Sequence, residues 1–420
     1  MLRRRAHEPA GPPRTRAYRG YLAAMLIDAV GNGLWAPVAL IFFTRAQDMP
    51  MAQVGAALSA GGLIGLALGP LGGNLVDRWG PLRPALLSNV VRAGVLALFP
   101  TVGSAWQLVV LAALFAASDR VFWTANAPMV ARLVPTAALP RALGTQNVMR
   151  IGGFMAGGGV GAAASGALFA SPGGLHLLAY ANAVSYCAAA LLLLTVRVPA
   201  APTARAPGPE PADGPGWRAL LDDRPFLLLC LVQLSFALAS ESLSVMLPLV
   251  ALNVMDGPSW LPGAAVLTAS LSLLAAKVPA AAYAESRPRP HSLVAACLVF
   301  AGAFLLLSSA EQWDKEWAAF VILGAALVGT VGDALFVPVM TTMAHEAAPD
   351  ALKGRYSAAF QTSWGLANVL APALFAGLLS VGNGVLWLAL TGLVLLTLPA
   401  VHRLGAGRAH TGSQIGSSAG

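Results

Sequence analysis

The stretch that connects the second and third apolar segments of this chain reads Gly73-Asn74-Leu75-Val76-Asp77-Arg78-Trp79-Gly80-Pro81-Leu82-Arg83. Gly73 carries no side chain, which would let a neighbouring helix approach closely. Asp77 can sit against a helix N-terminus, where the macrodipole favours an anion by about 0.3–1 kcal/mol. Arg78 and Arg83 can pair with that acid or with lipid phosphates. The alternative interpretation is an ordinary tight turn with basic residues on one side of a membrane.

The composition around this stretch identifies a membrane protein. The chain has 420 residues, of which 57% are hydrophobic and only 10% are charged, whereas soluble proteins carry about 25% charged residues. The class is therefore a polytopic α-helical membrane protein. The net charge of +8 would suit a nucleic-acid partner, but the basic residues gather on one side of the predicted membrane, and we expect no nucleic acid.

Twelve apolar stretches are long enough to span a bilayer, which takes about 20 residues each. They lie near Tyr21–Phe43, Met51–Leu75, Pro84–Pro100, Ala105–Leu133, Leu143–Ala170, Gly174–Val196, Pro225–Asn253, Leu261–Ala284, Ser292–Ala310, Trp317–His345, Tyr356–Leu379 and Gly384–His402.

The stretches form two halves of six. An N-terminal segment, 1–20, precedes the first bundle, 21–196, and a second bundle covers 225–402. The linker, 197–224, contains six prolines and is predicted to be a semi-extended tether. The tail, 403–420, is rich in Gly and Ser and is predicted to be disordered.

The basic residues also set the expected orientation, because cytoplasmic loops carry an excess of Lys and Arg. With the N-terminus in the cytoplasm, 20 of the 26 basic residues fall on that side, and only Arg45 and Lys315 fall on the other. We therefore expect a multi-pass protein of the plasma membrane, with both termini and the linker in the cytoplasm.

The two halves are related in sequence. A shift of 214 positions superimposes Asp119 on Asp333, Phe122 on Phe336, Met129 on Met343, Pro135 on Pro349 and Arg141 on Arg355. Asp28 and Glu241 lie 213 positions apart, so they are approximate equivalents. Internal repeats that frame a central site are typical of transporters.

The loop quoted first resembles the signature of the major facilitator superfamily, through Gly73, Asp77, Arg78, Gly80 and Arg83, with Leu75 also matching and Pro81 replacing a basic residue. The resemblance covers essentially the whole chain. It implies an all-α polytopic membrane protein with twelve transmembrane helices in two pseudo-symmetric six-helix bundles. It also implies that the loop acts as a latch for one conformation of the transport cycle. The stretch from Gly354 to Pro372 is similar to the eleventh helix of drug:proton antiporter branches of that superfamily.

Four acids fall inside the apolar stretches, at Asp28, Asp119, Glu241 and Asp333. A charge at the bilayer centre costs about 2.5–3.5 kcal/mol on insertion scales, so such acids usually have a function. The family resemblance implies that their helices line the central cavity, where protonation would neutralise an acid and permit the cavity to close. The alternative is that the acids form fixed ion pairs, with partners among three intramembrane arginines, Arg92, Arg120 and Arg150.

Tryptophans and glycines complete the candidate residues. Trp35, Trp123 and Trp364 lie on expected cavity helices and could stack on an aromatic or cationic substrate; the alternative is packing or interfacial anchoring. Small residues also recur at four-residue spacing, which lets helices pack closely. They are Gly61, Gly65, Gly69 and Gly73 in the second stretch, and Gly153, Gly157, Gly161 and Ser165 in the fifth.

These features predict a secondary active transporter and not an enzyme. No phosphate-binding loop is present, so we expect uphill transport to be driven by the proton gradient, without a cofactor or metal. The preferred function is proton-coupled export of an amphipathic small molecule, a drug or metabolite, by alternating access. Protons and membrane lipid are further expected partners, and the protein is expected to be a monomer. The alternatives are an importer or facilitator of a small nutrient and, less favoured, a polytopic membrane enzyme or sensor.

Overall fold

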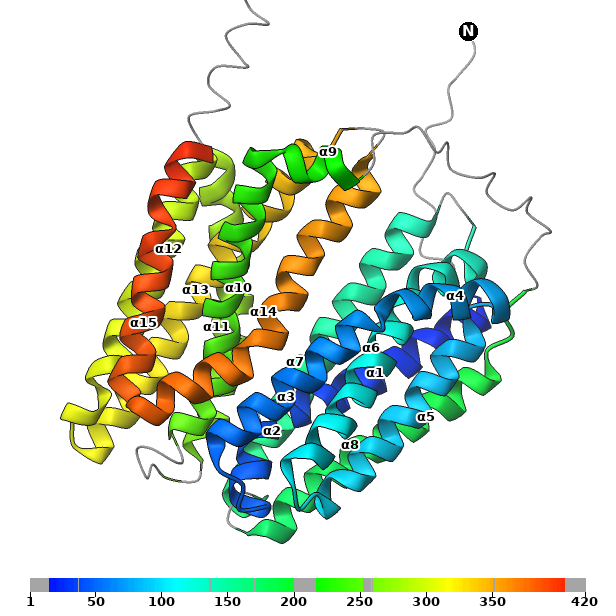
Figure 1. Ribbon diagram of the computed structural model, residues 1–420, viewed down its shortest axis with the longest axis horizontal. Coiled ribbons are helices and arrows are strands. Elements are labelled where there is room, and N and C mark those ends of the chain that lie inside the picture. Colours follow the sequence, from blue (N-terminus) through cyan, green and yellow to red (C-terminus); the bar gives the residue numbers. More distant parts are fainter. Residues whose placement is uncertain are drawn as a thin grey trace, which may run out of the picture. The chain divides into compact units, whose positions relative to one another are not determined.

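The structure, a computed structural model, describes residues 15–36, 38–135, 138–168, 171–199, 217–251, 258, 260–349 and 352–404, and the regular elements of this part are all helices (Figure 1). They divide into two compact units. Unit 1 comprises Met1–Ala36, Ala60–Gly161 and Gly173–Pro207, and unit 2 comprises Pro37–Ser59, Ala162–Pro172 and Gly208–Gly420. Most of the N-terminal segment, of the linker and of the tail lies outside the described residues.

Unit 1 is built mainly from five helices and part of a sixth. They are α1 (Arg16–Trp35), α4 (Gly69–Trp79), α5 (Leu82–Leu98), α6 (Ala105–Leu133), most of α7 (Leu139–Leu168) and α8 (Pro172–Thr195). The helix α3 (Met51–Ala67) contributes residues to both units. Thr15 caps α1 by accepting a hydrogen bond from the Tyr18 backbone N–H at 3.3 Å, so the first helix begins five residues before the predicted position.

Unit 2 contains the short helices α2 (Ala39–Ile41), η1 (Phe42–Ala46) and α9 (Trp217–Asp222), and six longer ones. These are α10 (Arg224–Leu249), α11 (Leu261–Ser286), α12 (Arg289–Ser309), α13 (Lys315–Ala347), α14 (Lys353–Val381) and α15 (Asn383–Leu396). The predicted extended linker is wrong for residues 217–222, because they form α9 with Leu220 buried.

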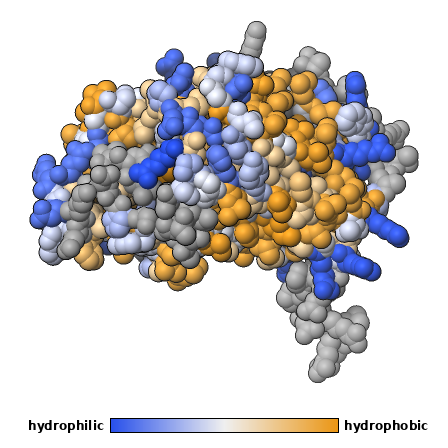
Figure 2. Space-filling model, turned by 90° about the horizontal axis from the view of Figure 1, so that it is seen from below, coloured by the Kyte–Doolittle hydropathy of each residue, from blue (hydrophilic) through white to orange (hydrophobic). Residues whose placement is uncertain are grey.

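Nine of the described helices are long and apolar enough to cross a membrane, or ten if α1 and its continuation Ala39–Ala46, bent by 51°, count as one span. The two other predicted stretches are also helical: the fifth is α7, and the second is divided at Leu68 into α3 and α4. Exposed apolar side chains cover broad areas of the surface, as expected for helices that face lipid (Figure 2).

The repeat seen in the sequence is also present in the structure. α6 and α13 end 214 positions apart, at Leu133 and Ala347. For α5 and α12 the offset is 208 residues, and every position buried on α5 between Pro84 and Leu96 has a buried counterpart on α12. The relationship between the two units is thus clearer from which positions are buried than from which residues are identical.

The predicted glycine ridges are sites of close helix packing. In unit 1, a Cβ added at Gly61 or Gly65 would collide with the backbone of α6, and one at Gly157 would collide with the carbonyl of Val30 on α1. Gly73 was expected to permit such an approach, but a Cβ there would have nothing within 4 Å. Gly72 is the residue that lies against α6, at Val121.

Candidate functional site

A buried arginine joins two of the intramembrane acids in unit 1. Arg92 of α5 is only 1% exposed. Its Nη2 lies 3.5 Å from Oδ1 of Asp28 on α1, and its Nη1 lies 3.2 Å from Oδ1 of Asp119 on α6. It also donates a hydrogen bond to the side chain of Asn89, one turn earlier on α5. Asp28 and Asp119 therefore share one cation.

Two aromatic rings enclose the guanidinium of Arg92. Its Cζ lies 4.4 Å from the ring centroid of Phe122 and 4.4 Å from that of Tyr186 on α8. The Tyr186 hydroxyl donates to the Asn32 side chain at 2.7 Å, which fixes the ring. Guanidinium groups form such contacts because a planar cation is attracted to the face of an aromatic ring. The alternative of a fixed ion pair, considered for all four acids, fits Asp28 and Asp119.

Arg150, a half-buried residue of α7, lies at the edge of this cluster. Its Cζ is 5.4 Å from the ring centroid of Trp123, and its Nη2 donates to the Asn147 side chain at 3.0 Å. No acid of the described residues lies within 4.0 Å of Arg150 or Arg120. Trp123 is 37% exposed, so it and Arg150 present an aromatic face and a cation at the surface of unit 1.

The acids of unit 2 have different surroundings. With its amide oriented to satisfy both neighbours, Asn368 of α14 donates to the two carboxylate oxygens of Glu241 on α10, at 2.6 and 3.1 Å. The amide oxygen of Asn368 accepts from Trp364 Nε1 at 3.2 Å. The Trp364 ring stacks on Phe336 with centroids 6.3 Å apart. Glu241 is thus held by a neutral donor.

Asp333 of α13 lies close enough to Glu241 for the two carboxylates to repel each other. It faces the side chain of Ser240, and its Oδ1 is buried without a hydrogen-bond partner. In the part of unit 2 that the structure describes, no Lys, Arg or His approaches either carboxylate within 4.0 Å. Unit 2 therefore holds two acids in membrane-spanning helices that have no basic partner among its described residues.

The residues at equivalent positions of the two units explain this difference. An offset of 208 residues aligns Arg92 with Phe300 of α12, and Asp28 with Phe236 of α10. Phe236 and Phe300 both pack on Phe336, with ring centroids 4.8 and 6.1 Å away. The charged cluster of unit 1 is thus replaced by an aromatic cluster in unit 2. The approximate equivalence of Asp28 and Glu241 is wrong, because burial pairs Asp28 with Phe236.

The remaining predicted residues are distributed elsewhere. Trp35 is buried and stacks on Phe99 with centroids 5.7 Å apart, in keeping with packing. At the turn between α4 and α5, Arg78 of α4 and Arg83 of α5 are exposed, and the Asp77 side chain lies outside the described part. Gly80 has φ +72°, and Arg132 of α6 approaches it.

Sequence reasoning missed several participants. Asn89, Tyr186 and Asn368 contact the acids or Arg92, but a single polar residue in an apolar stretch gives no sign of its partner. The aromatic cluster of unit 2 was missed for a similar reason, because phenylalanines are ordinary in apolar helices. The spacing of Ser88-Asn89 and Arg92, one helical turn apart on a buried face, was the available signal.

Two helical units with a shared repeat, many membrane-spanning helices and buried intramembrane charges define a polytopic transporter. The sequence model of the Major Facilitator Superfamily matches residues 21–372. The chain belongs to this superfamily, and it is a secondary transporter of that type and not an enzyme.

Solved structures agree on the fold. The nucleoside transporter NupG is similar with a TM-score of 0.73 at 14% identity, over 93% of this chain and 99% of that one. A bacterial homologue of the iron transporter ferroportin, in an inward-facing state, gives 0.69 at 15% identity, over 93% and 98%. A D-xylose–proton symporter gives 0.69 at 13%, over 92% and 96%. These likenesses confirm the predicted all-helical polytopic fold. No curated protein matches the chain.

Proposed function

We propose that this transporter exports an amphipathic small molecule in exchange for protons, by alternating access. The observation that carries the proposal is the pair Glu241 and Asp333, two neighbouring acids in membrane-spanning helices that lack a basic partner among the described residues. An unpaired carboxylate is costly in a medium of low dielectric constant, and binding a proton removes that cost. A proton is therefore the counter-ion that this pair lacks.

The contacts of Glu241 suggest how protonation could reach another helix. Asn368 donates to both oxygens of the carboxylate, and its own oxygen accepts from Trp364. A protonated Glu241 would present a donor where Asn368 now finds an acceptor, so one of the two bonds would be lost. Asn368 and Trp364 both belong to α14, so this helix would respond to the charge state of α10.

Unit 1 would serve a different role in the cycle. Asp28 and Asp119 already share Arg92, so a fixed cation balances one of their two negative charges, and no such cation is paired with Glu241 or Asp333 among the described residues. We assign this cluster to holding α1, α5 and α6 together while the protein moves. Trp123 and Arg150 would offer a stacking face and a cation to an amphipathic substrate.

The direction and setting are part of the same proposal. Export fits the likeness of the Gly354–Pro372 stretch to antiporters, and the loop around Gly80 would act as the latch. We further propose a monomer in the plasma membrane with both termini cytoplasmic, as the basic loops predict. A membrane potential contributes about 2.3 kcal/mol per charge and 100 mV, which is ample for coupled export.

The test is a substrate panel on vesicles that contain the purified protein and a pH-sensitive dye. Exchange predicts that substrate movement in one direction drives protons in the other, and that Glu241→Gln abolishes the dye response. Glu311→Gln removes an exposed acid of the same unit and should leave the response intact. Protons that move together with substrate would instead identify an importer, and substrate movement without any dye response would identify a facilitator.

A further inference from the structure

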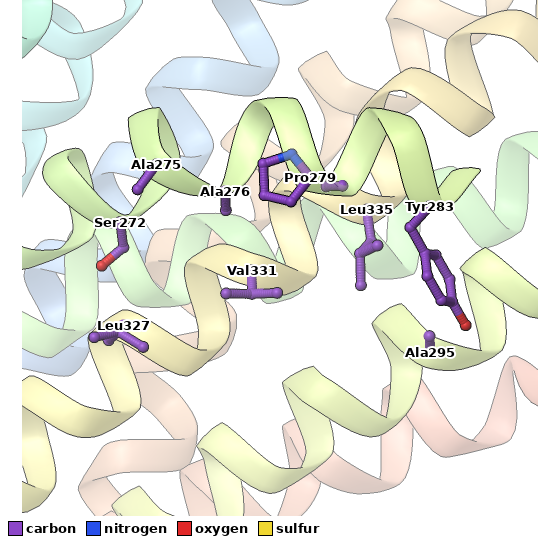
Figure 3. A pocket seen from close by; sticks show the side chains of 10 residues that line it. Ser272, Ala275, Ala276, Pro279, Tyr283, Ala295, Leu327, Val331 and Leu335 are labelled. Carbon is purple, nitrogen blue, oxygen red and sulfur yellow. The ribbon is translucent and has the colours of Figure 1, made fainter. Parts of the chain in front are cut away.

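An apolar groove lies on unit 2, and neither Glu241 nor Asp333 is among the residues that line it. α11 and α12 both pack along α13 but contact each other little, which leaves an opening between them (Figure 3). The cavity has a volume of about 650 Å³. Ala275 and Ala276 of α11 and Ala295 of α12 border it, and Val331 and Leu335 of α13 also line it. Small side chains on the two flanking helices therefore hollow the groove.

The side chains that line the groove suit a hydrocarbon ligand. Among the described lining residues, only Ser272 and Tyr283 bring side-chain oxygens, and the others are apolar. Sites for soluble ligands carry several placed polar groups that fix orientation. On the same helix, Leu271, Leu274 and Val278 are 65%, 63% and 78% exposed, so the groove opens on an apolar helix face.

The length of the groove matches one leaflet of a bilayer. Ser272 and Tyr283 mark its two ends on α11, and at 1.5 Å per residue they lie about 16 Å apart along the helix. The hydrocarbon core of a bilayer is about 30 Å thick, so one leaflet contributes about 15 Å. A lipid acyl chain has the polarity and the length that this groove accepts.

An exposed cation, Arg287, lies at the Tyr283 end of the groove. The guanidinium Cζ of Arg287 lies 5.1 Å from the ring centroid of Tyr283. Arg287 is exposed, and no acid of the described residues lies within 4.0 Å of it. Arg289, two residues on, is by contrast paired with Glu346. Arg287 is therefore exposed and without an acidic partner among the described residues, so it can bind a lipid phosphate. The basic loop that carries it is predicted to face the cytoplasmic leaflet, where anionic lipids concentrate.

We propose that the groove between α11, α12 and α13 binds an anionic phospholipid, with an acyl chain along Ala275 and Ala276 and the phosphate on Arg287. The site is separate from Glu241 and Asp333, and it does not depend on the direction or coupling of transport. The bound lipid would fill the opening between α11 and α12 and so support their packing on α13.

Native mass spectrometry of the purified full chain tests the site, with phosphatidylglycerol and phosphatidylcholine of identical acyl chains as probes. The native protein should retain phosphatidylglycerol about fivefold more strongly, in line with the contribution of one arginine near a lipid phosphate. Arg287→Gln should remove that preference, while Arg403→Gln, an exposed arginine of the same unit, should keep it. Ala275→Phe should fill the groove and weaken binding of both lipids.

Leu274→Phe supplies the control for added bulk, because Leu274 is exposed on α11 but does not line the groove. Equal lipid binding by Ala275→Phe and Leu274→Phe would overturn the proposal. So would a phosphatidylglycerol preference that survives Arg287→Gln. If Ala275→Phe abolished a dimer and left lipid binding unchanged, the groove would be the binding site of a second copy of the chain. That result would also overturn the proposal.

Discussion

Arg92 on α5 and Phe300 on α12 hold equivalent positions in the two units, 208 residues apart and both fully buried. Arg92 lies over the Phe122 ring at 4.4 Å, and Phe300 packs on Phe336, the counterpart of Phe122, with centroids 6.1 Å apart. One helical framework thus encloses a cation in unit 1 and an aromatic ring in unit 2. In the described part of unit 2, the acids have no counterpart of the arginine that pairs with the acids of unit 1.

Removing the buried arginine should destabilise the protein strongly. Arg92→Met leaves Asp28 buried and unpaired, and breaking a buried pair in this way costs about 3–5 kcal/mol. The measurement is thermal unfolding of the detergent-solubilised protein. Arg92→Met combined with Asp28→Asn should recover part of the loss, whereas Arg150→Met should have little effect because Arg150 has no acid within 4.0 Å in the described part. Equal stability of Arg92→Met and native protein would contradict the role assigned to the cluster.

The crossing of α1 and α7 should tolerate no side chain at Gly157. A Cβ there collides with the Val30 carbonyl, and overpacking of this kind costs about 1–3 kcal/mol. Gly157→Ala should therefore lower the melting temperature. Gly152→Ala is the matched control on the same helix, because a Cβ there has nothing within 4 Å. Equal melting temperatures of the two variants would contradict close packing of α1 against Gly157.

Gly80 should be sensitive to substitution, and Gly73 should not. Gly80 has φ +72° and ψ 171°, a region that only glycine occupies readily, so Gly80→Ala costs about 1–3 kcal/mol. The strain would distort the proposed latch, and transport should slow more than stability falls. Gly73→Ala should transport normally, since a Cβ there meets no atom within 4 Å. Comparable transport rates for the two variants would argue against a latch at this loop.

Trp123 should contribute to substrate binding. It is partly exposed beside Arg150, and an aromatic stacking contact is worth about 0.5–1.5 kcal/mol. Trp123→Leu should raise the KM of an amphipathic substrate with little change in the maximal rate. Trp106→Leu, another exposed tryptophan of α6, is the comparison. If the KM is unchanged in Trp123→Leu, the substrate does not stack there.

The sequence predicted the helical class, the twelve apolar stretches and the α6–α13 repeat, because hydropathy and the Asp119–Asp333 correspondence act over whole segments. It listed Arg92 among three possible partners but could not choose it, since the choice depends on which face of α5 meets α1 and α6. It paired Asp28 with Glu241 because both are acids. The true counterpart of Asp28 is Phe236, which is also buried but has an apolar side chain. Burial is seen only in the structure.

The coupling of transport to protons by Glu241 and Asp333 is tested most directly by uphill transport in vesicles under an imposed pH gradient, without a membrane potential. The native protein should accumulate substrate against its gradient. Glu241→Gln and Asp333→Asn should lose this accumulation and still exchange labelled for unlabelled substrate, while Asp119→Asn should keep accumulating it if it remains folded. Uphill transport by the double variant Glu241→Gln, Asp333→Asn at the native level would contradict the account.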